Sequence, residues 1–124
     1  MHQAHTVLVV DDEPAVREML EDVLSSEGHE VMTAPDGAAA LDALRGGTSR
    51  PCMILLDLMM PRMNGWDFAE ELRRDEQLRD IPFVIIAANP RFASDAPRLG
   101  ARSWLGKPLQ LDDLLNTVDE LCAG

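Results

Sequence analysis

The sequence is poor in several features, and each shortage excludes a class of protein. It contains only two cysteines, and they lack the spacing of a zinc site. No apolar run approaches the roughly 20 residues that a membrane-spanning helix needs. Residues 1–6 lack the basic and apolar regions of a signal peptide. We therefore expect a cytoplasmic protein without membrane contact, in which Cys52 and Cys122 are separate small apolar side chains and not a disulfide.

Basic residues are also scarce. The chain has 11 Lys and Arg against 22 Asp and Glu, which gives a formal net charge of −11. Nucleic acids are bound by clustered basic side chains, so direct nucleic-acid binding is not expected. The acidic charge favours divalent cations or basic partner surfaces instead. Lys107 is the only lysine, which suggests that a compact ammonium group is needed at that point.

Apolar segments of strand length alternate with segments of helical spacing along the whole chain. The expected strands are residues 6–10, 30–34, 54–57, 81–88 and 102–105. Strand and helix alternate five times with short links, which predicts one doubly wound α/β domain with a parallel sheet. Pro90 and Pro97 interrupt the fourth helical segment, so we expect that helix to be short or distorted.

Charged residues follow three of the expected strands. Asp11 and Asp12 come directly after the first strand, Asp57 ends the central one, and Lys107 follows the last. The carboxyl ends of strands in an open α/β sheet lie at one edge, where ligands bind. Helix capping alone would account for a single Asp, but two adjacent carboxylates repel each other unless a cation compensates them. The pattern therefore predicts a functional site at this edge.

The chain resembles the receiver domain of two-component response regulators from end to end. The matching motifs are Val9-Val10-Asp11-Asp12-Glu13, Leu55-Leu56-Asp57-Leu58-Met59-Met60-Pro61 with Asn64-Gly65, Ile81-Pro82, Gly100-Ala101 and Lys107-Pro108. The resemblance implies a flavodoxin-like, five-stranded parallel sheet in the order 2-1-3-4-5. It implies a single receiver domain at residues 1–124, with its core at 6–122 and no output domain in this chain.

The resemblance also implies a role for each site residue. Asp57 is the expected phosphoacceptor. The expected Mg²⁺ ligands are Asp12, Asp57, the backbone carbonyl of Met59 and, through water, Asp11. The phosphoryl oxygens would be bound by Lys107 and by the backbone of Ala88, and a cis peptide is expected before Pro108. Magnesium prefers a shell of oxygen ligands, and phosphoryl transfer depends mainly on positioning and charge neutralisation, so these residue types suit the chemistry.

Two positions, at the end of the fourth strand and in the fifth, depart from the family pattern. Ala87 stands where the family has Thr or Ser, and Trp104 stands where it usually has Tyr or Phe. The missing hydroxyl would ordinarily bond a phosphoryl oxygen, so we expect weakened switching of the outer face, residues 91–121. Trp104 is either a switching residue or ordinary packing at the edge of the sheet.

The function expected from the resemblance is that of a phosphoacceptor, not of an enzyme, although it takes part in its own phosphorylation and dephosphorylation. The phosphoryl donor would be a phosphohistidine of a histidine kinase or phosphotransfer protein. The signal would pass to a downstream target or output domain, with a homodimer through the outer face as a further option. The alternative is a pseudo-receiver that binds partners without phosphorylation. A haloacid-dehalogenase-type phosphatase fits poorly because Met59 stands where that family needs Asp, and an acidic first turn would repel a dinucleotide.

Overall fold

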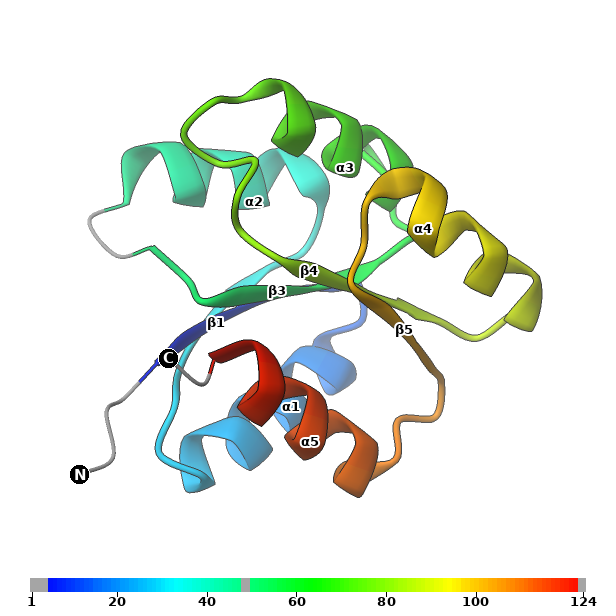
Figure 1. Ribbon diagram of the computed structural model, residues 1–124. Coiled ribbons are helices and arrows are strands. Elements are labelled where there is room, and N and C mark those ends of the chain that lie inside the picture. Colours follow the sequence, from blue (N-terminus) through cyan, green and yellow to red (C-terminus); the bar gives the residue numbers. More distant parts are fainter. Residues whose placement is uncertain (1–4, 48–49, 123–124) are drawn as a thin grey trace.

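A central sheet lies between two layers of helices in the computed structural model, which describes residues 5–47 and 50–122 (Figure 1). The strands are β1 (Thr6–Val10), β2 (Glu30–Ala34), β3 (Met53–Asp57), β4 (Phe83–Ala87) and β5 (Ser103–Gly106). The helices are α1 (Pro14–Ser26), α2 (Gly37–Gly46), α3 (Gly65–Arg74), a 3-10 helix (Pro90–Ser94), α4 (Asp95–Leu99) and α5 (Leu111–Cys122). The expected domain of residues 1–124 includes positions outside the described residues.

All five strands are parallel, in the order β2-β1-β3-β4-β5. Every residue of β3 and β4 is buried, because helices cover both faces of the sheet at these strands. This burial explains why both strands are nearly continuous apolar runs and do not alternate with polar residues. The predicted fold class and strand order are confirmed.

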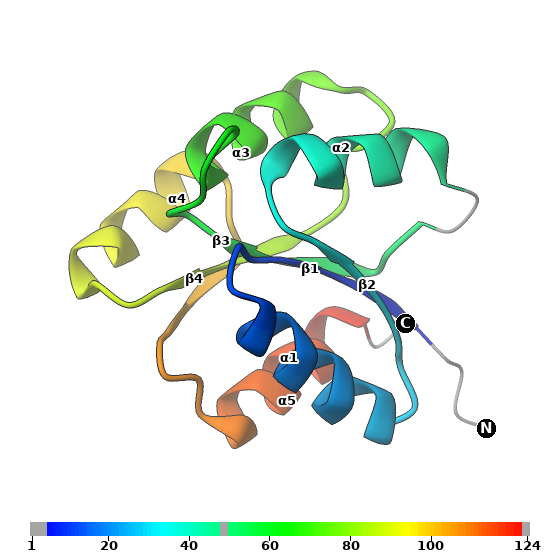
Figure 2. The same cartoon turned by 180° about the vertical axis from the view of Figure 1, so that it is seen from behind.

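The core has two halves because successive strand residues point to opposite faces of the sheet. One half, which includes Leu8, Ile54 and Phe68, lies under α2, α3 and α4. The other, which includes Val7, Leu55 and Val118, lies under α1 and α5. Figures 1 and 2 show these helix layers from opposite sides. None of the helices formed by the described residues is both long and apolar enough to cross a membrane.

Three helices follow the carboxyl ends of strands β1, β2 and β3. Helix α1 starts with Pro14, whose missing N–H is not needed in a first turn. The Asp36 side chain caps α2 by accepting the Ala39 N–H at 2.9 Å. Asn64 caps α3 by accepting the Asp67 N–H at 2.9 Å. The loops that precede α1 and α2 are short, whereas residues 58–64 separate β3 from α3.

The fourth helical segment is broken, as predicted. Residues Pro90–Ser94 form a 3-10 helix, and α4 continues for only five residues. Pro97 lies in the first turn of α4, where its ring and missing N–H are tolerated. Gly100 then ends the helix with a φ of 87°, a left-handed conformation that glycine adopts without strain.

Three strands have other bounds than predicted. The third begins at Met53 and not at residue 54. The fourth strand is Phe83–Ala87 and does not extend over residues 81–88. Pro82 has no N–H to donate, although its carbonyl still accepts the Ile54 N–H at 3.0 Å. The fifth strand is Ser103–Gly106, one residue later than predicted. Apolar composition marks the strands well but does not locate their ends.

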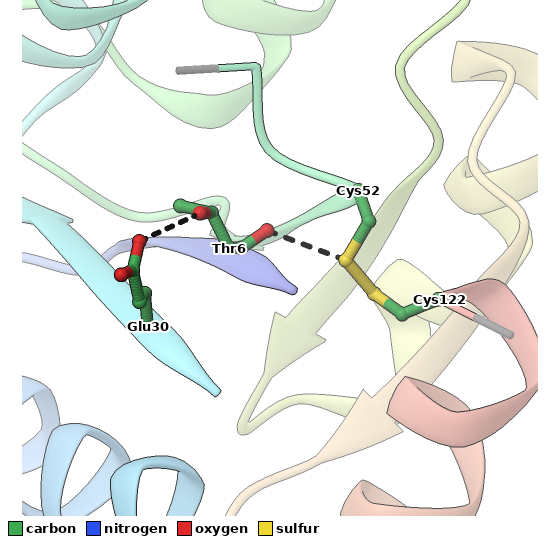
Figure 3. Close-up of a disulfide and its surroundings, with 4 residues drawn as sticks. All are labelled: Thr6, Glu30, Cys52 and Cys122. Carbon is green, nitrogen blue, oxygen red and sulfur yellow. Dashed lines mark hydrogen bonds between the residues drawn. A yellow bond between two sulfur atoms is a disulfide. The ribbon is translucent and has the colours of Figure 1, made fainter. Parts of the chain in front are cut away.

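The prediction for the cysteines is wrong, because Cys52 and Cys122 form a disulfide. Figure 3 shows the bond joining the segment that enters β3 to the end of α5. The two Cα atoms are 5.3 Å apart, within the range that a disulfide spans. The residues are 70 positions apart in the sequence, and only the packing of α5 under the sheet brings them together. Because the two cysteines are far apart in the sequence, the sequence alone did not indicate that they pair.

Candidate functional site

The carboxyl edge of the sheet gathers the four charged residues that the sequence analysis selected. Oxygen atoms of Asp11, Asp12 and Asp57 lie within 4.8 Å of one another. Lys107 Nζ is 3.6 Å from Asp57 Oδ2. The parallel strands bring these groups together, since β1, β3 and β5 all point toward this edge. The predicted convergence is therefore present, while the chemical role of each residue stays a prediction.

The start of α3 packs directly against the end of β3. The Gly65 N–H donates to the Leu58 carbonyl at 3.0 Å. A Cβ on Gly65 would lie 2.6 Å from the Asp57 carbonyl oxygen, a separation at which the backbone would have to shift. The Asn64-Gly65 pair thus combines a helix cap with the one residue that allows this close approach. It fixes the turn that carries Asp57.

Asp11 is completely buried and its contacts hold it in place. Its Oδ1 accepts the Glu13 N–H at 2.9 Å, and its carbonyl accepts a hydrogen bond from Arg17 at 2.7 Å. Its Oδ2 forms an ion pair with Lys107 Nζ at 2.9 Å. Both Asp11 oxygens are thus engaged, whereas Asp12 is only half-buried and lines a cavity.

Lys107 is the only cation in direct contact with the carboxylates among the described residues. The backbone N–H of Lys107 donates to the Ala87 carbonyl at 3.1 Å. This bond extends the pairing of β4 and β5 and fixes the backbone of Lys107. Burial alone would lower the pKa of Lys107, but contacts with Asp11, Asp57 and Glu13 outweigh it and raise the pKa above its ordinary value. The side chain is therefore charged at neutral pH. The predicted cis peptide before Pro108 is present.

Asp57 is 5% exposed, and burial is the main reason that its pKa rises from 3.8 to about 6. The negative charge of Asp11 raises the pKa further, while Lys107 and the Met59 N–H, 3.3 Å from Asp57 Oδ1, act in the opposite direction. The positive charge of Lys107 and the Met59 N–H thus do not fully compensate the negative charge of ionised Asp57. A bound cation would relieve this excess of negative charge.

The donor set fits magnesium. Three clustered carboxylates supply hard oxygen ligands, which Mg²⁺ prefers. Asp12 and Asp57 both line an open cavity of about 520 Å³, together with Glu13, Met59, Ala87, Ala88, Asn89, Phe92 and Lys107. The cavity also leaves room for the water molecules that Mg²⁺ usually keeps. The ligand roles of the Met59 carbonyl and of Asp11 through water stay predictions.

Ala87 and Trp104, the two departures from the family pattern, lie on the same face of the sheet. Ala87 ends β4 and is buried, and it places a methyl group where the family pattern has the hydroxyl of Thr or Ser. The indole of Trp104 lies along β5, with its nearest ring atom 3.3 Å from where a Cβ of Gly106 would be. Its buried Nε1 has no hydrogen-bond partner among the described residues. Trp104 packs against the core cluster that contains Ala87.

Sequence analysis did not select three residues that contact this site. Glu13 reaches Lys107 at 3.2 Å, Arg17 bonds the Asp11 carbonyl, and Phe92 lines the cavity. The position of Glu13 directly after the acidic pair was a signal for its involvement. Phe92 carried no comparable signal, because the interrupted fourth helix gives its side chain no predictable direction.

Comparisons with known proteins agree with this geometry. Residues 7–119 match the model of the response regulator receiver domain. Response regulator MprA of Mycobacterium sp. (strain KMS) is 39% identical over 111 residues, which cover 88% of this chain and 46% of MprA. The chain thus spans about half the length of this relative. Protein PilH of Pseudomonas aeruginosa is 31% identical over 120 residues, which cover 95% of this chain and 98% of PilH.

A solved structure shows the same similarity. The crystal structure of response regulator TrrA from Thermotoga maritima, in complex with Mg²⁺ and BeF, has a TM-score of 0.83 and is 32% identical in sequence. The match covers 94% of this chain and 98% of TrrA. The acidic triad of Asp11, Asp12 and Asp57, with Lys107, is the pocket typical of these proteins. The chain therefore belongs to the response regulator receiver domain family, whose members are signalling phosphoacceptors and not classical enzymes.

Proposed function

We propose that this protein accepts a phosphoryl group on Asp57 from a phosphohistidine of a histidine kinase or phosphotransfer protein. The observation that carries the proposal is a buried carboxylate with one ammonium group 3.6 Å away and two further carboxylates beside it, all at an open cavity. The binding of Mg²⁺ and BeF by the similar TrrA supports the same chemistry here.

In the proposed transfer, one carboxylate oxygen of Asp57 attacks the phosphorus atom. The bond from phosphorus to the donor imidazole nitrogen breaks as the new P–O bond forms, and the imidazole leaves carrying the electron pair of the broken bond. Lys107 and the Ala88 backbone bind the phosphoryl oxygens and hold the group in line. Asp12, Asp57, the Met59 carbonyl and, through water, Asp11 would hold Mg²⁺, which would supply charge neutralisation.

Intact-mass measurement tests this function. After incubation with acetyl phosphate and Mg²⁺, the wild-type protein should gain the mass of one phosphoryl group. Acetyl phosphate supplies a reactive phosphoryl group, and Asp57 supplies the nucleophile. Asp57→Asn should gain none. Withholding Mg²⁺, or the variant Asp12→Ala, should greatly reduce the gain. A wild-type protein that stays unmodified, or an Asp57→Asn variant modified equally, would favour the pseudo-receiver, which the missing hydroxyl at Ala87 also makes plausible.

The proposed output surface is the face formed by α4, β5 and α5, and we propose that its response to phosphorylation is weak. A phosphoryl group shifts a two-state surface only by the difference in its interactions with the two states. Ala87 offers no hydroxyl to the phosphoryl group, and a hydrogen bond to a charged group contributes roughly 1.5–3 kcal/mol. A downstream target, an output domain or a second copy of the chain would bind this face.

Restoring the hydroxyl tests the proposed weak switch. Ala87→Thr should enlarge the change in amide hydrogen exchange over residues 89–107 when beryllofluoride and Mg²⁺ are added. The population shift between states should grow by roughly tenfold or more. Ala87→Val has nearly the same shape as threonine without the hydroxyl, and it should leave the response as it is in wild type. A large wild-type response, unchanged by Ala87→Thr, would show that another group provides the coupling.

A further inference from the structure

The side chain of Glu13 contacts Lys107 and does not cap the helix that it precedes. It stands at the N-terminal cap position of α1, but its side chain caps no backbone N–H of that helix. Its Oε1 instead accepts a hydrogen bond from Lys107 Nζ at 3.2 Å, across 94 residues of sequence. The Glu13 backbone is itself fixed, because its N–H bonds Asp11 Oδ1 and its carbonyl accepts the N–H groups of Val16 and Arg17. The contact with Lys107 therefore depends on the conformation of the Glu13 side chain and not on its backbone.

The ammonium group of Lys107 is shared by three carboxylates, and that of the phosphoacceptor is the most distant of them. Nζ is 2.9 Å from Asp11 Oδ2 and 3.2 Å from Glu13 Oε1, but 3.6 Å from Asp57 Oδ2. Asp11 is buried and anchored, whereas the Glu13 side chain is 60% exposed, and within the described part of the chain its carboxylate is held only by Lys107. Of the two carboxylates closer to Lys107, Glu13 is therefore the one whose ion pair with Lys107 can break without disturbing the buried site.

We propose that Glu13 is a positioning residue that tethers the ammonium group of Lys107 in the unphosphorylated protein, in competition with Asp57, and releases it when a phosphoryl group arrives. The inference rests on the proposed function, since it assigns a regulatory residue to the same site. An incoming phosphoryl group must compete with the Glu13 carboxylate for the same ammonium donors. Glu13 thereby lowers the affinity of the site for phosphoryl groups, by roughly two- to fivefold, as expected from an exposed ion pair.

Two substitutions of Glu13 and one matched control separate a tether from a general effect of charge. Glu13→Gln removes the charge. Glu13→Asp keeps the charge but shortens the side chain by one C–C bond, about 1.5 Å, so that its carboxylate no longer reaches Lys107. Asp is also a favourable N-cap residue, so this variant should fold. Glu18→Gln changes the net charge equally at an exposed position of α1 outside the cavity.

The measurement is the dissociation constant of the beryllofluoride complex in saturating Mg²⁺, followed by ¹⁹F NMR of the bound fluoride. Glu13→Gln and Glu13→Asp should both bind about two- to fivefold more tightly than wild type. Glu18→Gln should bind as wild type does. The unliganded melting temperature of Glu13→Gln should stay close to that of Glu18→Gln, because a tether acts on ligand affinity and not on the fold.

Three results would overturn the tether. Unchanged affinity in both Glu13 variants would show that the contact has no effect on the site. Tighter binding in Glu13→Gln alone would show that charge matters and reach does not. An equal gain in Glu18→Gln would point to the net charge of the protein. A wild-type protein that binds no beryllofluoride at all would overturn the proposed function itself, a result distinct from these three.

Discussion

Reducing the disulfide between Cys52 and Cys122 should lower the free energy of unfolding by about 4 kcal/mol. The bond closes a loop of 70 residues, and the loss of chain entropy in the unfolded state grows with loop length. In a domain of this size such a change corresponds to a drop in melting temperature of roughly 10–20 °C. The effect is large because the bond spans more than half of the chain.

Thermal melts with and without a reducing agent measure this effect. Cys122→Ala is the matched control, because it removes the bond and places a small apolar side chain at a buried position. Its melting temperature should be lower than that of oxidised wild type and insensitive to the reducing agent. Alkylation of the denatured, unreduced wild-type protein should detect no free thiol. Two free thiols, or a melt that the reducing agent leaves unchanged, would contradict the disulfide.

Replacing Asp57 by Asn should stabilise the protein at pH 8 without Mg²⁺, by on the order of 2–3 kcal/mol. Burial and the charge of Asp11 raise the pKa of Asp57 to about 6, from 3.8. The folded protein therefore binds the Asp57 proton more tightly than the unfolded chain does. The resulting stability is fully present below pH 3.8 and is lost as the pH rises through 6. At pH 8 the wild-type protein carries an unfavourable buried charge, which Asn removes.

Urea unfolding of both proteins at pH 8 and pH 5 tests the sign and the size of this effect. At pH 5 most wild-type Asp57 is protonated, so the advantage of Asn should fall to roughly half. Magnesium should also reduce the advantage at pH 8, because the cation stabilises only the wild-type carboxylate. Asp42→Asn, on the exposed face of α2, removes the same charge and is the matched control, which should be no more stable than wild type at pH 8. An Asp57→Asn variant no more stable than wild type at pH 8 would contradict the argument.

The fold class and the edge of the sheet at which the site lies could be predicted from the sequence. The β-branched and apolar runs that become β1, β3 and β4 predict buried strands, because only helices on both faces can cover such runs. Parallel strands have their carboxyl ends at one edge, so the residues that follow them converge whatever the details of packing. Asp11, Asp57 and Lys107 could therefore be selected from their positions alone.

The contacts between side chains that are distant in sequence could not be predicted, because they depend on how the helices pack against the sheet. Hydrophobic periodicity describes which face of an element is buried, but it does not say which segments meet or how far a side chain reaches. Cys52 thus looked like an isolated apolar residue until α5 brought Cys122 to it. The approach of Glu13 to Lys107 likewise depends on how α1 and the end of β5 are placed. The raised pKa of Asp57 follows from burial and neighbouring charge, which exist only in the folded chain.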